Sequence, residues 1–281
     1  MNNLTLKAKL FTLMAVALLS LLAVGGIGWN GIGHVDEAMD EIGSVRLPSV
    51  LGLQIVSEGQ TAVRSANRYV AFFENDYKAQ AKFAEELKDK EEIWKRIEKG
   101  WKIYEPLPQT AEETVLWNQF VKEWGDWKAA DAKVTETIAA MSNNTSANPK
   151  EVEKRQKELF AEFYQRAEAT MHLFEQSENT LIKIIDLNVK YGDDAKAGGD
   201  ADAAMAKRNM LAGSAILLVI LLLLGVWIMR SILNQLGGEP AYVADVVKRV
   251  AEGDLTVQVQ TKANDHGSML FAIKGMIDKL S

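Results

Sequence analysis

Two long apolar runs without a charged residue constrain the fold of this chain more than any other feature. The first covers residues 10–29 and the second covers residues 210–229. About twenty apolar residues in a helix, at roughly 1.5 Å per residue, are enough to cross the hydrocarbon core of a bilayer. A core helix of a soluble protein usually carries some polar positions over that length. We therefore predict a transmembrane helix at each run.

The first run also has a second interpretation, as a cleaved signal peptide. Lys7 and Lys9 precede it, and the segment Ala23-Val24-Gly25 resembles a small-residue cleavage site. The apolar part of a signal peptide is about 7–15 residues long. Because this run is longer, a membrane helix is the favoured interpretation.

The charges beside the two runs predict the orientation of the chain in the membrane, because basic residues are retained on the cytoplasmic side. Basic residues precede the first run and directly follow the second: Lys7, Lys9 and Arg230. Lys207 and Arg208 favour the opposite orientation, but only weakly. We expect a cytoplasmic tail over residues 1–9, an extracytoplasmic domain over residues 30–208 and a cytoplasmic segment over residues 230–281.

Composition excludes several classes of function. The formal net charge of −6 and the pI near 5.3 leave no basic surface typical of nucleic-acid binding. The absence of cysteine excludes disulfides and thiol chemistry. His34, His172 and His266 are far apart and lack the spacing of metal ligands. We therefore expect no catalytic residue, no metal site and no cofactor.

Residues 30–208 have the pattern of helices, with apolar side chains recurring three and four positions apart. Prolines at residues 105–109 and a polar run at residues 142–149 are expected to interrupt them. The predicted helices run from the membrane to about residue 75, then over residues 77–104, over residues 110–141, and from residue 150 back to the membrane. Four such helices predict an up-down-up-down bundle.

Two positions are expected to disturb these helices. Pro48 lacks a backbone donor and predicts a kink in the first helix. The glycines in Tyr191-Gly192 and Gly198-Gly199 are expected to soften the fourth helix. Tryptophans spaced seven apart in the second and third helices could line an aromatic pocket, but packing between those two helices is the favoured interpretation.

The sequence after the second apolar run predicts two short helices. A break at Gly237-Gly238-Glu239-Pro240 precedes an apolar stripe, and the segment Glu252-Gly253-Asp254-Leu255 ends it. An alternating connector and a second apolar stripe follow, from Met269 to Leu280. Such short helices cannot bury both stripes alone, so we expect a second copy of the module as partner.

These residues resemble a HAMP domain, a module that relays signals behind a membrane helix. The resemblance rests on Pro240 at the start of the first helix and on the junction Glu252-Gly253-Asp254-Leu255, and it implies a relay role for these five residues. The usual Asp-Glu pair at the second helix is Asp265-His266 here. This departure leaves the role of the acidic pair open.

With the two apolar runs and the helical outer segment, the whole chain resembles the N-terminal part of a methyl-accepting chemotaxis protein. The resemblance implies an all-α fold: a four-helix sensor bundle in the periplasm, two helices in the bacterial inner membrane and a HAMP helix pair. It also implies a homodimer, higher receptor clusters, and a ligand that is a small molecule or a binding protein. The cytoplasmic hairpin that controls a kinase and its adaptor is not among these residues, so we expect the chain to be one part of a larger receptor.

The first outer helix carries the candidate ligand site. Arg64 and Arg68 lie four apart on one helix face, with Thr61 one turn earlier and Asn67 between them. Paired guanidinium groups suit a carboxylate, and receptors that sense aspartate use arginines at a similar place. Counting back along the fourth helix makes Tyr164 a partner at the same level. The alternative is that both arginines pair with acids at the surface and contribute little.

Two other functions are compatible with the sequence. The alternative to a chemoreceptor is the sensor half of a histidine kinase or a cyclic-dinucleotide enzyme, because these share membrane spans and HAMP modules with chemoreceptors. A membrane protein whose bundle only mediates oligomerisation is the third interpretation. Saturable binding of a small molecule to residues 30–208 excludes the third.

Overall fold

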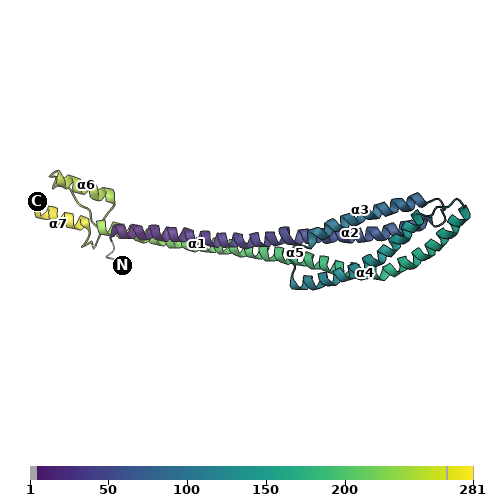
Figure 1. The fold of residues 1–281 in the computed structure, drawn as a ribbon. Coiled ribbons are helices and arrows are strands. Elements are labelled where there is room, and N and C mark those ends of the chain that lie inside the picture. The colour runs from purple at the N-terminus through teal and green to yellow at the C-terminus, as the bar shows by residue number, and fades with distance from the viewer. Residues whose placement is uncertain (1–4, 264, 281) are drawn as a thin grey trace. The chain divides into compact units, whose positions relative to one another are not determined.

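The computed structural model describes residues 5–263 and 265–280, and every regular element in them is a helix. Residues 1–4 of the expected tail, and residues 264 and 281 of the expected HAMP module, lie outside the described residues. The helices, labelled in Figure 1, are α1 (Leu6–Asp40), a π-helical segment (Glu41–Arg46), α2 (Leu47–Val70), a 3-10 turn (Ala71–Phe73), α3 (Gln80–Tyr104), α4 (Ala111–Ser142), α5 (Pro149–Leu236), α6 (Pro240–Ala251) and α7 (Met269–Leu280). The predicted all-α fold is confirmed.

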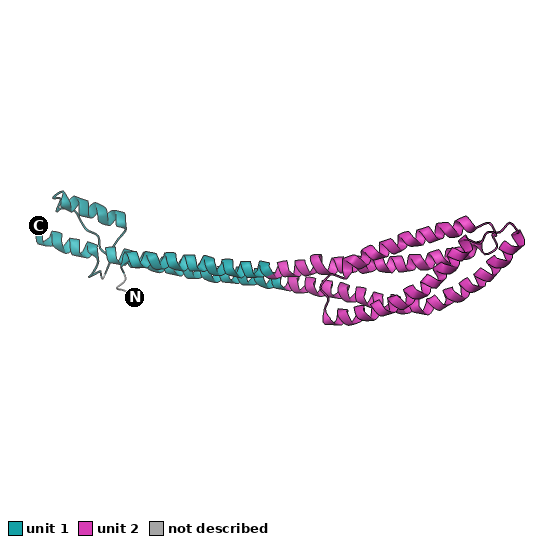
Figure 2. Cartoon of the chain, viewed as in Figure 1, with its two compact units in different colours: residues 1–33, 202–281 teal, residues 34–201 magenta. Residues whose placement is uncertain are grey.

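The chain divides into two compact units, coloured separately in Figure 2. One unit comprises residues 34–201 and contains the helix bundle. The other comprises residues 1–33 together with residues 202–281. The apolar runs lie in α1 and α5, and both helices therefore contain residues of each unit.

Two helices are long and apolar enough to cross a membrane. Only 6% of the residues in each apolar window are buried, so these windows are not the core of a soluble fold. Large side chains such as Leu211 and Leu223 are 74% and 66% exposed. Side chains this apolar are stable in lipid and not in water, which fits the predicted membrane helices.

The structure shows how the helices run at the two places where the sequence predicts irregularity. The first outer helix is irregular at Glu41–Arg46, one turn before Pro48, which lies in the first turn of α2. The helix continues from α1 through this segment into α2, so the missing N–H of Pro48 removes one donor from it. The glycines of the fourth helix do not interrupt α5. A Cβ at Gly199 would lie 2.9 Å from the Cβ of Ala38, so this glycine allows close packing of α1 against α5.

The bundle of residues 34–201 has an up-down-up-down arrangement. Gly52 of α2 packs against the backbone of Gly100 in α3, while the distal end of α2 meets the start of α3 through Val70 and Phe83. The two helices are therefore antiparallel. One core cluster, on α2, α3, α4 and α5, contains Trp117, Trp124 and Trp127, and the predicted packing of tryptophans between α3 and α4 is confirmed.

A small separate core joins α6, the connector and α7 in the other unit. Val243 and Val246 of α6 pack with Val257 and Val259 of the connector and with Leu270 of α7. Alternation of valine along the connector places both side chains on one face. The helix pair and its connector therefore have the arrangement that the sequence predicts.

Candidate functional site

Four of the five predicted ligand residues line one cavity of about 280 Å³ in the bundle. The cavity lies among α2, α4 and α5. Its polar and charged lining residues are Arg64, Asn67, Arg68, Tyr164, Glu168 and Thr170, and its apolar floor is formed by Ala71, Trp127, Phe163, Ala167, Met171 and Phe174. Thr61 is not among these residues, and its side chain is exposed.

The two arginines enter the cavity from one face of α2. The guanidinium carbon of Arg64 lies 3.9 Å from the centroid of the Phe174 ring, which is a cation–π contact. Arg68 is exposed at the rim. Among the described residues, neither guanidinium makes an ion pair with a carboxylate. The alternative in which both arginines pair with surface acids therefore finds no support in their contacts.

Asn67 and Tyr164 are held by hydrogen bonds within the protein. The Asn67 side-chain amide donates to Oδ1 of Asp131 at 2.7 Å, and its carbonyl oxygen accepts from Nζ of Lys90 at 2.7 Å. The Tyr164 hydroxyl donates to Glu74 at 2.9 Å. Burial and this hydrogen bond raise the pKa of Tyr164. These two side chains therefore shape the cavity, while the arginines remain available to an anion.

A buried charge lies behind Asn67. Lys90 and Asp131 have side chains only 2% exposed, and Nζ of Lys90 lies 3.1 Å from Oδ1 of Asp131. Lys90 also donates to Thr135 at 2.8 Å, which satisfies all three ammonium donors. Desolvation lowers the pKa of Lys90, and the Asp131 carboxylate opposes that change. Buried, fully satisfied networks of this kind fix one arrangement of the helices that they join.

Charge in the cavity favours a ligand with a negative group. Two guanidinium groups and one carboxylate, Glu168, line it. Each charge-assisted hydrogen bond from a guanidinium to a carboxylate contributes about 1.5–3 kcal/mol. The remaining lining is aromatic and aliphatic, which suits a small organic group. Within the described residues, no group of histidines and acids is arranged to hold a metal ion.

Sequence reasoning missed a second buried polar cluster, at the other end of the bundle. Arg46, in the π-helical segment, donates to Glu41 at 2.7 Å, to Glu113 at 2.9 Å and to Asn188 at 3.0 Å. Tyr104 donates to the other oxygen of Glu113 at 2.7 Å. Desolvation would lower the pKa of Arg46, but the hydrogen bonds to Glu41 and Glu113 outweigh it and the pKa is raised.

This cluster has one signal in the sequence, the capping box at the start of α4. Thr110 accepts from the Glu113 backbone N–H at 3.2 Å, and the Thr110 N–H donates to the Glu113 carboxylate at 3.3 Å. A capping glutamate is usually at the surface, whereas Glu113 is fully buried. Two of the residues that bind its carboxylate, Arg46 and Asn188, lie 67 and 75 residues away in the sequence, and a local sequence pattern does not reveal them.

The predicted relay residues lie at the two ends of α6. Pro240 is the first residue of α6, and Gly253 after its last turn has a φ of +89°, which favours glycine. Asp254 accepts from Arg249 at 2.6 Å and from the Thr256 hydroxyl at 2.6 Å, and these contacts lower its pKa to about 2. Glu252 is exposed, and Leu255 is half-buried beside the connector.

Comparison with known proteins gives one match. The family model described as a four helix bundle sensory module for signal transduction matches residues 3–203, which is most of the chain. No curated protein and no solved structure matches the chain.

Proposed function

Because this chain belongs to the family of four-helix-bundle sensory modules for signal transduction, we propose that it is the sensing part of a bacterial chemoreceptor for a small carboxylate. The ligand site is the cavity lined by Arg64 and Arg68, with Asn67 and Tyr164 shaping its walls. Thr61, whose side chain does not line the cavity, is left out of this site.

One observation carries the proposal: two guanidinium groups, four residues apart, line a partly apolar cavity without an acidic ion-pair partner among the described residues. Arginine binds carboxylate with two parallel hydrogen bonds, and two arginines on one face fix both its position and its orientation. The buried Phe174 ring beside Arg64 lowers the local dielectric and strengthens that attraction.

The proposed route of the signal follows α5, which carries Tyr164 and Phe174 and also contains the second apolar run. A bound carboxylate acts through any difference in its affinity for two positions of this helix. We assign α6 and α7 to a HAMP module that receives the motion, with Pro240 and the junction from Glu252 to Leu255 as its relay residues. The receptor is placed in the inner membrane with residues 30–208 in the periplasm.

The apolar residues left uncovered on α7 support a homodimer. Met269, Met276 and Leu280 are 47%, 43% and 63% exposed, although they belong to the apolar stripe of that helix. A second copy would cover them in a parallel helical bundle.

Isothermal titration of the full chain in lipid nanodiscs tests the ligand class. We expect one or more members of a panel of small mono- and dicarboxylates to bind saturably, and their uncharged amides to bind at least tenfold more weakly. Loss of one charge-assisted contact corresponds to about tenfold or more in Kd. Arg64→Ala and Arg68→Ala are each expected to weaken binding by that factor.

Arg96→Ala is the matched control, because Arg96 is a bundle arginine that pairs with Glu58 at 3.4 Å and does not line the cavity. Its affinity should stay within twofold of the wild type. Carboxylate binding that survives both cavity substitutions, or no binding across the panel, refutes the proposed site.

A further inference from the structure

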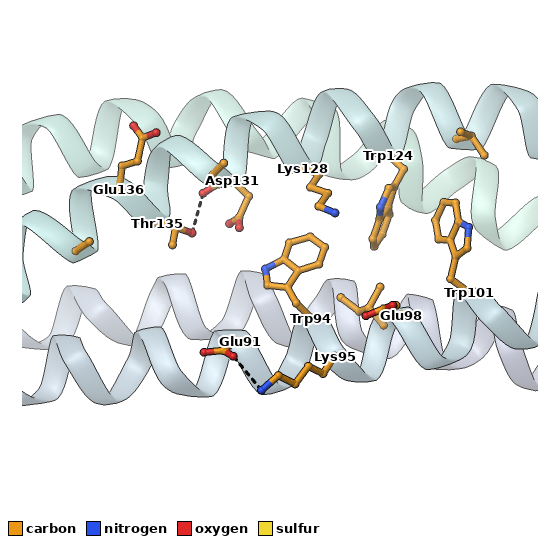
Figure 3. A pocket seen from close by; sticks show the side chains of 14 residues that line it. Glu91, Trp94, Lys95, Glu98, Trp101, Trp124, Lys128, Asp131, Thr135 and Glu136 are labelled. Atoms are coloured by element: carbon orange, nitrogen blue, oxygen red, sulfur yellow. Dashed lines mark hydrogen bonds and ion pairs between the residues drawn. The ribbon is translucent and has the colours of Figure 1, made fainter.

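A larger groove lies between α3 and α4 on the same unit (Figure 3). It has a volume of about 900 Å³, and the arginine cavity shares no lining residue with it. Trp94 and Trp101 project into it from α3, and Trp124 projects from α4. Aliphatic side chains, including Ile97 and Val121, complete its apolar lining.

The three indole rings form a continuous aromatic wall. The centroid of Trp124 lies 5.9 Å from that of Trp94 and 5.7 Å from that of Trp101, and neither pair is stacked in parallel. Trp94 and Trp101 are only half-buried, although rings of this size usually bury most of their surface in a core. The exposed parts of both rings face the groove, where a flat ring can pack against them.

The charges along the groove are paired, with one exception. Each lining carboxylate has a basic partner within 4 Å: Glu91 has Lys95, Glu98 has Lys102, Asp131 has Lys90 and Glu136 has Arg166. Lys128, which also lines the groove, makes no ion pair within 4 Å of a described carboxylate, although its charge is near enough to help lower the pKa of Glu98. Its Nζ lies 5.2 Å from the centroid of the Trp94 ring.

We infer that this groove is a second ligand site, for a planar aromatic acid whose ring packs on Trp94, Trp101 and Trp124 and whose carboxylate pairs with Lys128. The ligand ring buries apolar area against the indole faces, and aromatic pairs gain stability beyond that burial. The ligand carboxylate pairs with the one cation of the groove that makes no ion pair within 4 Å among the described residues.

The test is isothermal titration of the full chain in nanodiscs with 2-naphthoate as probe. Arg64→Ala/Arg68→Ala is used as the background, so that binding at the arginine cavity does not contribute. We expect saturable binding in this background. Two related compounds separate the contributions: 2-naphthamide keeps the rings without the charge, and cyclohexanecarboxylate keeps the charge without an aromatic ring. Each is expected to bind at least tenfold more weakly.

Lys128→Met is expected to raise the Kd for 2-naphthoate about tenfold or more. Lys128 is exposed, so this substitution leaves the core intact. Lys95→Met is the matched control, because Lys95 lines the same groove but is already paired with Glu91 at 2.9 Å, and its Kd should stay within about threefold. No saturable binding, or equal effects of the two lysine substitutions, overturns the inference. Binding of 2-naphthamide as tight as that of 2-naphthoate also overturns it.

Discussion

Removing the charge of Asp131 gives the most direct test of how the bundle is held together. Asp131→Asn keeps the size of the side chain but leaves Lys90 without its anionic partner. Both side chains are only 2% exposed, so water does not replace the lost charge. Lys90 must then stay charged in the core without compensation, or lose its proton in the folded state.

Loss of the Lys90 proton in the folded state sets an upper limit on the loss of stability. Neutralising a lysine at pH 7 requires about 1.36 kcal/mol for each pH unit below its ordinary pKa of about 10.4, hence about 4–5 kcal/mol. Removal of one partner of a buried ion pair usually costs about 3–5 kcal/mol. We therefore expect Asp131→Asn to lower the free energy of unfolding by about 3–5 kcal/mol at pH 7.

The pH dependence has a definite sign. In the variant, the folded-state pKa of Lys90 lies further below its unfolded-state value, so the unfolded chain binds more protons at alkaline pH. Stability then rises with pH, by up to about 1.4 kcal/mol per unit, until the unfolded lysine also loses its proton. The wild type should rise less, because Asp131 opposes the lowering of the Lys90 pKa.

Urea unfolding of the full chain in detergent measures both effects. Tryptophan fluorescence reports on the bundle, since five of the seven tryptophans lie in α3 and α4. Asp126→Asn is the control, because Asp126 is an exposed acid on the same helix, and it should change stability by less than about 0.5 kcal/mol. A loss below about 1 kcal/mol for Asp131→Asn, or no rise in its stability between pH 7 and pH 10, refutes the reasoning.

Three further outcomes are expected. Gly100→Ala should destabilise the bundle by about 1–3 kcal/mol in the same unfolding assay, because its Cβ would lie 2.7 Å from the Gly52 carbonyl oxygen; Gly125→Ala, with no atom within 4 Å of the new Cβ, should be neutral or stabilising. Thr110→Ala should lower the free energy of unfolding by about 1 kcal/mol, because it removes the cap of α4. Thr114→Ala makes the same change in side chain without removing the cap, and it is the control. The pKa of Asp254 falls from 3.8 to about 2 on folding, so its contribution is complete above about pH 5 and is lost as pH falls toward 2. The protection factor of the Thr256 amide, taken against its intrinsic exchange rate at each pH, should fall over that range in the wild type and not in Asp254→Asn.

The positions of the helices were predictable because local chemistry decides them. The prolines before Thr110 and the polar run before Pro149 end helices whatever the rest of the chain does. The close packing of Gly199 on Ala38, which offsets the penalty of about 1 kcal/mol for a glycine in a helix, was not predictable. Such an offset depends on a neighbour more than 150 residues away, which the local pattern does not contain.

The candidate site was predictable in part for the same reason. Helical spacing places Arg64, Asn67 and Arg68 on one face, and the count along the fourth helix places Tyr164 at their level. Spacing gives the direction of a face but not the length of a cavity. The Phe174 ring lies against Arg64, whereas Thr61, one turn before Arg64 in α2, lies outside the lining of the cavity.

The linings of the two cavities are in contact through tryptophan rings, and this has a consequence for how ligands act. Trp127 lines the arginine cavity, and its ring centroid lies 5.5 Å from that of Trp94 and 4.8 Å from that of Trp124, which line the groove. A ligand in either cavity that shifts Trp127, directly or through Trp94 and Trp124, changes the free energy of binding in the other cavity.

Such coupling is reciprocal. A carboxylate bound in the arginine cavity should therefore change the Kd of 2-naphthoate in the groove by a certain factor, and bound 2-naphthoate should change the Kd of that carboxylate by the same factor. Titrations in both orders on the wild-type chain measure this factor. Trp127→Phe should bring it closer to one. Trp117→Phe should leave it unchanged, since Trp117 packs on Trp101 but lines neither cavity. A factor of one in the wild type would mean that these tryptophan rings do not move when either ligand binds, and helix α5 would then respond to the arginine cavity alone.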